Sequence, residues 1–171
     1  MALIAAITLA GTAHAQNNNP DSGSYGALGL TTYDWDTVGL DAKLGYNFNR
    51  NFGVEAQGMI GLSSESSPVS PAANAATLTS KPDYTIGAFA VARLPLSDQF
   101  EVFARGGYHQ TQTNIKISNV LGTDYDVTHD GFAVGGGLQF NLGDKTAIRS
   151  EYTYLDKSDY HTFSVGYVRK F

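Results

Sequence analysis

Apolar and non-apolar positions alternate with a period of two along two neighbouring stretches, residues 38–48 and 52–62. This alternation places successive side chains on opposite faces of a β-sheet. The non-apolar face is largely glycine with an occasional single charge, such as Lys43 or Glu55. Asparagines within residues 47–51 favour a turn between the two strands. Strands with an apolar outer face and an inner face of small, sparsely charged side chains are typical of a small barrel surrounded by lipid.

The same pattern recurs and predicts eight strands, at residues 25–33, 38–48, 52–62, 84–94, 100–108, 132–142, 147–154 and 161–171. The facing of residues 25–33 is ambiguous, and that of residues 84–94 is weaker because Phe89 and Val91 oppose the main apolar register. Tight turns are expected near residues 49, 96 and 143, and longer or more polar connections near 35, 72, 120 and 158. The longest loop is expected at residues 63–82. The polar residues 109–129 are expected to continue the preceding strand outward, form a loop and return. This pattern predicts an all-β fold, an eight-stranded antiparallel up-and-down transmembrane β-barrel.

Composition supports one membrane-embedded domain behind an export signal. The chain has 171 residues with 19 Gly, 10 Tyr, 9 Phe and no Cys, at a formal net charge of −5. An apolar run followed by Ala13-His14-Ala15 predicts a signal peptide at residues 1–15, which leaves residues 16–171 for the barrel. Without cysteine there is no disulfide framework or thiolate metal site, and mild acidity argues against nucleic-acid binding. We therefore expect no cofactor and no metal ion.

Four segments, LGYNFNRNFGVEAQG, LPLSDQFEVFARGGY, TAIRSEYTYLD and FSVGYVRKF, together resemble the eight-stranded outer-membrane β-barrel family. That group includes OmpA-like transmembrane domains and small porin-family or opacity-type surface proteins. The resemblance implies an outer-membrane location in a Gram-negative bacterium. It also implies a terminal signal for the barrel-assembly machinery, here Phe163, Val165, Gly166, Tyr167 and Phe171. Arg169 departs from the family, which usually has an aromatic residue there.

Seven charged residues are predicted to lie inside the barrel: Lys43, Glu55, Arg93, Glu101, Arg105, Arg149 and Glu151. Counting outward from the tight turns predicts that Lys43 faces Glu55 and that Arg93 faces Glu101 across neighbouring strands. Buried ions must pair, because burying them alone is costly. The family resemblance also places an interior arginine at Arg149. The layer is interpreted as a plug that fills the lumen, with a salt-bridge gate over a narrow water path as the alternative.

Two other clusters suggest chemistry less strongly. His161, Ser158, Ser164 and Glu151 lie near the last connection, where a lipid A-modifying barrel enzyme would need its catalytic groups. Residues three apart on a strand point to opposite faces, however, so His161 and Ser164 do not form a pair. The acidic run Asp124, Asp126, His129 and Asp130 is interpreted as a solvated loop rather than a cation site. We predict that the protein is not an enzyme.

The favoured function is a structural or surface-interaction role through loops carried on a rigid barrel. The second hypothesis is a narrow porin gated by the interior charges, and the third is the lipid A-modifying enzyme. The expected partners are outer-membrane lipid and lipopolysaccharide, the barrel-assembly machinery, and host or environmental surface ligands. The chain is expected to be a monomer that binds no nucleic acid.

Overall fold

The computed structural model describes residues 22–35, 37–62, 65–69, 76–118, 124–157 and 159–171. The predicted signal peptide at residues 1–15 lies outside them. The strands are β1 (Gly23–Tyr33), β2 (Thr37–Asn47), β3 (Phe52–Gly61), β4 (Glu65–Val69), β5 (Ala76–Pro95), β6 (Phe100–Ser118), β7 (Asp124–Gly143), β8 (Thr146–Leu155) and β9 (Tyr160–Lys170). No helix of sufficient length and apolarity to cross a membrane occurs in this part of the chain.

Eight of these strands close into one antiparallel ring. Each pairs with its neighbours in the order β3-β2-β1-β9-β8-β7-β6-β5, and a further pairing of β3 with β5 closes the sheet on itself. The first and last strands meet along β1 and β9. The predicted eight-stranded up-and-down barrel is therefore confirmed, since closure leaves no open sheet edge within the ring. Among the described strands, the short β4 pairs with β5 alone and lies outside the ring.

Within the ring, burial alternates along the strands wherever their side chains are described, and it settles the two ambiguous strands. In β1, Tyr25 and Tyr33 are buried in the lumen, whereas Leu28 and Leu30 are exposed on the outer surface. In β5, Phe89 and Val91 lie inside, opposite an outer register of mainly apolar residues. Exposed aromatic residues gather at the margins of the ring. They lie near strand ends at Trp35, Phe48, Phe52, Phe100 and Phe171, and where β6 and β7 extend past the ring at Tyr108 and Phe132. The outer surface is thus an apolar band with aromatic margins, as in barrels surrounded by lipid.

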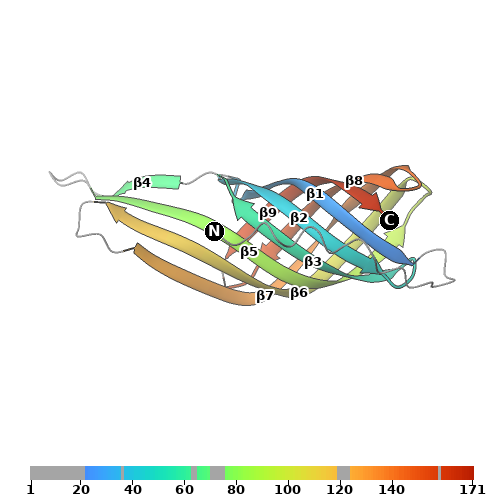
Figure 1. Cartoon of the computed structure of the whole chain (residues 1–171), viewed down its shortest axis with the longest axis horizontal. Coiled ribbons are helices and arrows are strands. Elements are labelled where there is room, and N and C mark those ends of the chain that lie inside the picture. Colours follow the sequence, from blue (N-terminus) through green and yellow to red (C-terminus); the bar gives the residue numbers. More distant parts are fainter. Residues whose placement is uncertain (1–21, 36, 63–64, 70–75, 119–123, 158) are drawn as a thin grey trace.

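The two ends of the barrel differ. At one end, here called the tight-turn end, residues 48–51, 96–99 and 144–145 join consecutive strands. At the other end β5, β6 and β7, with 19 to 20 residues each, continue far past the strands of 10 to 11 residues that make up the rest of the ring. Figure 1 shows these three strands extending to the left beyond the barrel, with β4 beside β5. We call residues 65–69, 76–83, 110–118 and 124–131 the strand extension.

The strand extension corrects the prediction of a loop at residues 63–82. The expectation that residues 109–129 continue the strand outward and return is confirmed by β6 and β7. Most residues of the two segments belong to β4, β5, β6 and β7, and only residues 63–64, 70–75 and 119–123 fall outside the described part. The other two connections of this end, residues 34–36 and 156–159, are about as short as the tight turns. The loop at residues 63–82 was predicted because that segment lacks apolar-polar alternation, which a strand needs only where one face contacts apolar surroundings.

The connection between β1 and β2 reinforces the seam where the barrel closes. The backbone N–H of Asp34 donates to the carbonyl of His161 at 2.8 Å, and the N–H of His161 donates to the Asp34 carboxylate at 2.8 Å. Asp34 and Trp35 both have positive φ, at 48° and 70°, and this conformation is uncommon for a large side chain. Trp35 stacks on Phe163 of β9 at 5.6 Å between ring centroids. The single tryptophan of the chain therefore reports on this seam.

Candidate functional site

Charged side chains from opposite walls meet in a closed ring inside the lumen. Arg105 of β6 contacts Glu55 at 2.8 Å and Glu151 at 2.6 Å between nitrogen and oxygen. Arg149 of β8 contacts the same two glutamates, each at 2.6 Å. The four side chains are 0–3% exposed. Because β3 and β8 are four strands apart around the barrel, this central ring joins opposite walls.

Lys43 and Asp41 of β2 extend the central ring on one side. Lys43 pairs with Asp41, and its Nζ lies 3.6 Å from Glu151. Gln57 donates to Asp41 at 2.8 Å and accepts from Arg105 at 2.7 Å. With these residues the buried layer holds three cations and three carboxylates, so its formal charges cancel. Such cancellation offsets part of the desolvation cost of burying ions.

Tyr25 connects the central ring to a second ion pair nearer the tight-turn end. Its hydroxyl donates to Glu55 at 2.7 Å and accepts from Arg93 at 2.6 Å. Arg93 lies 3.7 Å from Glu101 between nitrogen and oxygen. The polar groups of the lumen therefore form one connected network from β2 and β3 to β5, β6 and β8.

Aromatic rings cover both arginines of the central ring. The guanidinium of Arg105 lies 4.0 Å from the centroid of Phe89, and that of Arg149 lies 3.9 Å from the centroid of Phe103. A cation over an aromatic face is attracted by the ring quadrupole, most strongly where water is excluded. These contacts hold each guanidinium between its carboxylate partners and the barrel wall.

The structure brings Lys43, Glu55, Arg105, Arg149 and Glu151 together, but the predicted cross-strand partners were wrong. Lys43 lies opposite Gln57, and Glu55 lies opposite Gly45. Across the next tight turn, Arg93 lies opposite Phe103 and Glu101 lies opposite Pro95. Each predicted pairing was displaced by two residues. Arg93 and Glu101 still approach each other, because both side chains project into the lumen near the same turn.

Sequence reasoning missed Asp41, Gln57 and Tyr25, and also Thr153, which accepts a hydrogen bond from Arg105 at 2.8 Å. Asp41 lies two residues from Lys43 on the same inward face, so the alternation alone could have identified it. Gln57 shares the inward face with Glu55, but it is uncharged and the prediction considered charged side chains alone. Tyr25 gave no signal, because apolar side chains occupy both faces of β1.

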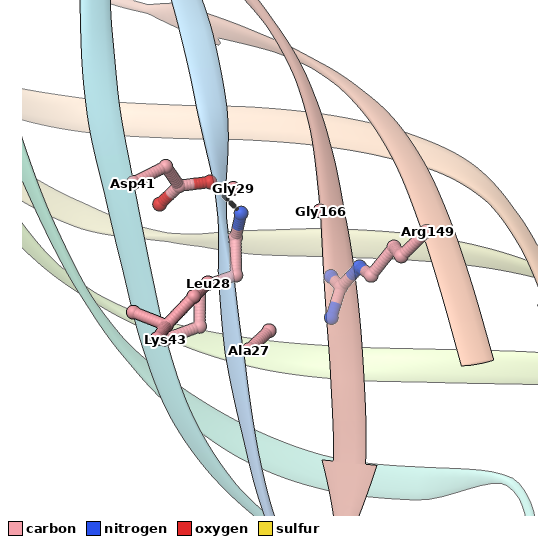
Figure 2. Close-up of a pocket in the computed structure, with 7 residues that line it drawn as sticks. All are labelled: Ala27, Leu28, Gly29, Asp41, Lys43, Arg149 and Gly166. Atoms are coloured by element: carbon pink, nitrogen blue, oxygen red, sulfur yellow. Dashed lines mark hydrogen bonds and ion pairs between the residues drawn. The ribbon is translucent and has the colours of Figure 1, made fainter. Parts of the chain in front are cut away.

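The lumen is filled beside the charged layer and toward the strand extension. Beside the layer, Figure 2 shows Lys43 directed at Asp41 and the Arg149 side chain extending toward the strand that carries Gly166. The cavity that these residues line holds about 10 Å³, which is at the lower limit for a single water. Toward the strand extension, an apolar cluster of Tyr33, Met59, Phe89, Ala133 and Leu155 packs together with Tyr160.

Toward the tight-turn end the lumen opens into a polar vestibule of about 560 Å³. Arg93, Glu101 and Gln139 belong to its lining, together with exposed residues such as Arg50 and Lys145 of the turns. The vestibule gives water access to the Arg93–Glu101 pair. The cavity beside the central ring, lined by Lys43 and Arg149, holds only about 10 Å³.

Gly45 makes room for the Tyr25 ring, and replacing it is expected to disturb the network. A Cβ at Gly45 would lie 2.1 Å from a Tyr25 ring atom, whereas a Cβ at Gly58 would meet nothing within 4 Å. We expect Gly45→Ala to lower the free energy of unfolding by about 1–3 kcal/mol through overpacking, and Gly58→Ala to leave it unchanged or slightly raised. Urea unfolding in lipid vesicles, followed by Trp35 fluorescence, measures both. Equal stability of the two variants would contradict the role of Gly45.

Among the side chains that the structure describes, the other sequence candidates do not assemble into a reactive site. Ser164 is buried in the lumen while His161 is exposed outside, where its Nδ1 lies 2.5 Å from the Tyr152 hydroxyl. Ser158 lies outside the described residues. In the acidic run, Asp130 accepts a hydrogen bond from Tyr108. Within the described residues, no group of three His, Cys, Asp or Glu side chains is placed to hold a metal ion.

The expected assembly signal lies on β9. Val165 and Tyr167 are exposed on the outer surface, as is Phe171, which follows the strand. Arg169 is also exposed and lies opposite Thr146. A long cationic side chain at the end of a strand reaches the polar interface, so the arginine is compatible with a lipid-facing strand. Recognition by the assembly machinery stays a prediction.

Three solved structures share the fold at low sequence identity. Ail, the attachment invasion locus protein of Yersinia pestis, is 20% identical, with 88% of this chain and 99% of Ail covered and a TM-score of 0.64. The N-terminal β-barrel domain of Pseudomonas aeruginosa OprF is 12% identical, with 88% and 98% covered and a TM-score of 0.61. Neisserial surface protein A is 15% identical, with 88% and 96% covered and a TM-score of 0.52.

No curated protein sequence matches this chain. The family described as "Outer membrane protein beta-barrel domain" matches residues 2–171, which is almost the entire sequence. The match agrees with the closed eight-stranded ring, the apolar outer band and the aromatic margins. The chain therefore belongs to the outer membrane protein β-barrel family and is a protein of the outer membrane.

Proposed function

We propose that this protein is a closed scaffold that presents its strand extension for interaction at the cell surface. The observation that carries the proposal is the continuation of β5, β6 and β7 beyond the barrel (Figure 1). In bacterial outer-membrane barrels the short turns face the periplasm and the long connections face outward. That orientation puts the strand extension outside the cell, where recognition by segments on a rigid scaffold is common.

The comparisons support a surface role at the level of fold. Ail was crystallised in complex with the heparin analogue sucrose octasulfate, and Neisserial surface protein A is named for its location. Both are barrels of the same architecture. Their sequence identities with this chain are low. The partner of this chain therefore has to be inferred from the residues of its own strand extension.

A narrow porin is the second candidate, and the polar vestibule of about 560 Å³ is the observation that favours it. The central ring and the apolar cluster argue against a porin, because they fill the lumen one after the other along the barrel axis. An eight-stranded barrel is just wide enough for side chains to fill. We therefore favour a lumen that is plugged, with the central ring as a structural element.

Trimming the strand extension is expected to abolish surface binding while the barrel stays folded. In the trimmed variant an Asn-Gly turn replaces residues 63–81 and another replaces residues 111–129, because Gln110 and Asp130 already face each other across β6 and β7. A laboratory Gram-negative strain displaying each chain is tested for adhesion to epithelial monolayers. Adhesion should fall by about ten-fold or more in the trimmed variant.

Two controls make this test decisive. The trimmed chain must keep the Trp35 fluorescence and the unfolding midpoint of the parent chain, since the seam between β1 and β9 is untouched. A second variant, Asp98→Asn with Asp144→Asn, changes only the tight-turn end and should adhere like the parent. Undiminished adhesion by a folded trimmed variant would disprove the proposed function.

A further inference from the structure

The strand extension has one covered edge and one open edge. On the β5 side, β4 pairs with residues from Ala76 to Ser80. On the other side, β7 pairs with β8 only from Ala133 onward, so residues 124–131 have β6 as their single strand partner among the described residues. Half of the backbone N–H and C=O groups of such an edge face away from the sheet and favour the addition of another strand.

The open edge is acidic. Residues 124–131 carry Asp124, Asp126 and Asp130 and no lysine or arginine. The whole extension side of the molecule shares this sign. Among the residues whose side chains the structure describes, this side holds four acidic groups, Asp34, Asp130, Asp156 and Asp159, against the single lysine Lys157. At the tight-turn end Arg50, Lys145, Arg169 and Lys170 outnumber Asp98 and Asp144. The protein is therefore polarised along the barrel axis.

The charge pattern favours one class of binding partner for this edge over two others. A second copy paired edge to edge would bring aspartates close to their counterparts, and like charges facing across strands are destabilising. A sulfated polyanion of the kind bound to Ail would meet the same repulsion. An extended segment rich in lysine or arginine satisfies both the backbone groups and the charges, since complementary potentials favour encounter and fix register.

We propose that the open edge of β7, residues 124–131, binds a cationic extended polypeptide segment by strand addition. The proposal rests on the proposed function and specifies the partner class of the same surface. The backbone edge supplies hydrogen bonds along the strand, and the aspartates supply the preference for lysine and arginine.

The test uses the full chain in lipid nanodiscs and three probes. These are a labelled peptide of lysine alternating with threonine and valine, the same peptide with glutamate for lysine, and heparin. The lysine peptide is expected to bind at least about ten-fold more tightly than either acidic probe. Its affinity should fall as NaCl rises from about 50 to about 300 mM, because salt screens exposed charges.

Protein variants and amide exchange locate the site. Asp124→Asn with Asp126→Asn should weaken the lysine peptide by about ten-fold, while Asp98→Asn with Asp144→Asn at the opposite end should leave the affinity unchanged. Asp130 is left intact because it holds Tyr108. Bound peptide should slow hydrogen exchange of amides in residues 124–131 and not in residues 76–80, which β4 already covers.

Three results would overturn the inference. One is tighter binding of heparin than of the lysine peptide. Another is binding of the lysine peptide without added amide protection in residues 124–131. The third is absence of peptide binding while adhesion still requires the strand extension, which would leave the proposed function standing and remove only this partner class. Loss of both peptide binding and extension-dependent adhesion would remove the two proposals together.

Discussion

Arg149→Ala is expected to lower the free energy of unfolding by about 3–5 kcal/mol, because removing one partner from a buried ion cluster leaves uncompensated charge behind. Arg149 contacts both Glu55 and Glu151 at 2.6 Å and stacks on Phe103. Without it, Arg105 is the one remaining arginine that bridges the two glutamates. Urea unfolding in lipid vesicles, with Trp35 fluorescence as the signal, measures the loss.

Two comparisons separate charge from volume in this prediction. Lys145→Ala removes an exposed cation from the turn just before β8 and should change stability by no more than about 0.5 kcal/mol. Arg149→Met keeps much of the volume but leaves excess negative charge. Adding Glu151→Gln to it restores the balance and should recover part of the stability. If this double variant is no more stable than Arg149→Met, charge pairing is not what the central ring contributes.

In planar bilayers, the folded parent chain is expected to give no steady conductance steps, and so is Arg149→Ala. The central ring is one of two barriers, and the apolar cluster of Tyr33, Met59, Phe89 and Leu155 still closes the lumen in that variant. An apolar constriction excludes ions by excluding water. Steps are expected only when both barriers are reduced, as in Arg149→Ala with Met59→Ala and Phe89→Ala.

The conductance result discriminates between plug and gate. Steady steps from folded parent chain, altered in size or gating by Arg149→Ala, would establish the porin alternative. If the triple variant is folded by Trp35 fluorescence and still gives no conductance steps, then more of the lumen is filled than these two layers account for.

Much of the barrel was predictable from alternation, because each lipid-facing strand has one apolar and one small or polar face. Register was not. A slip of one residue turns every side chain to the wrong face, but a slip of two preserves the pattern. Lys43 was therefore assigned to Glu55 instead of Gln57 with no conflict visible in the sequence. The asparagines of residues 47–51 offer several turn centres and did not resolve the choice.

The strand extension was predicted only in part, for a different reason. Outside the bilayer, neither face of β6 needs to be apolar, so the usual signal disappears. The surviving signal is the recurrence of threonine and isoleucine at Thr111, Thr113, Ile115 and Ile117, which suits a strand by propensity. Tyr25 shows a third limit, because its inward position depends on the closure of the seam between the first and last strands.

The distribution of ring members among the strands has a consequence for how the barrel is made. Arg149 and Glu151 arrive together on β8, two residues apart on its inward face, whereas Glu55 and Arg105 belong to strands earlier in the chain. The pair of Arg149 and Glu151 is electrically neutral, and so is the pair of Glu55 and Arg105, before the two pairs come into contact. The final hairpin of β8 and β9 therefore enters the membrane without delivering a net charge to its interior, and closure exchanges ionic neighbours instead of creating or burying a lone ion.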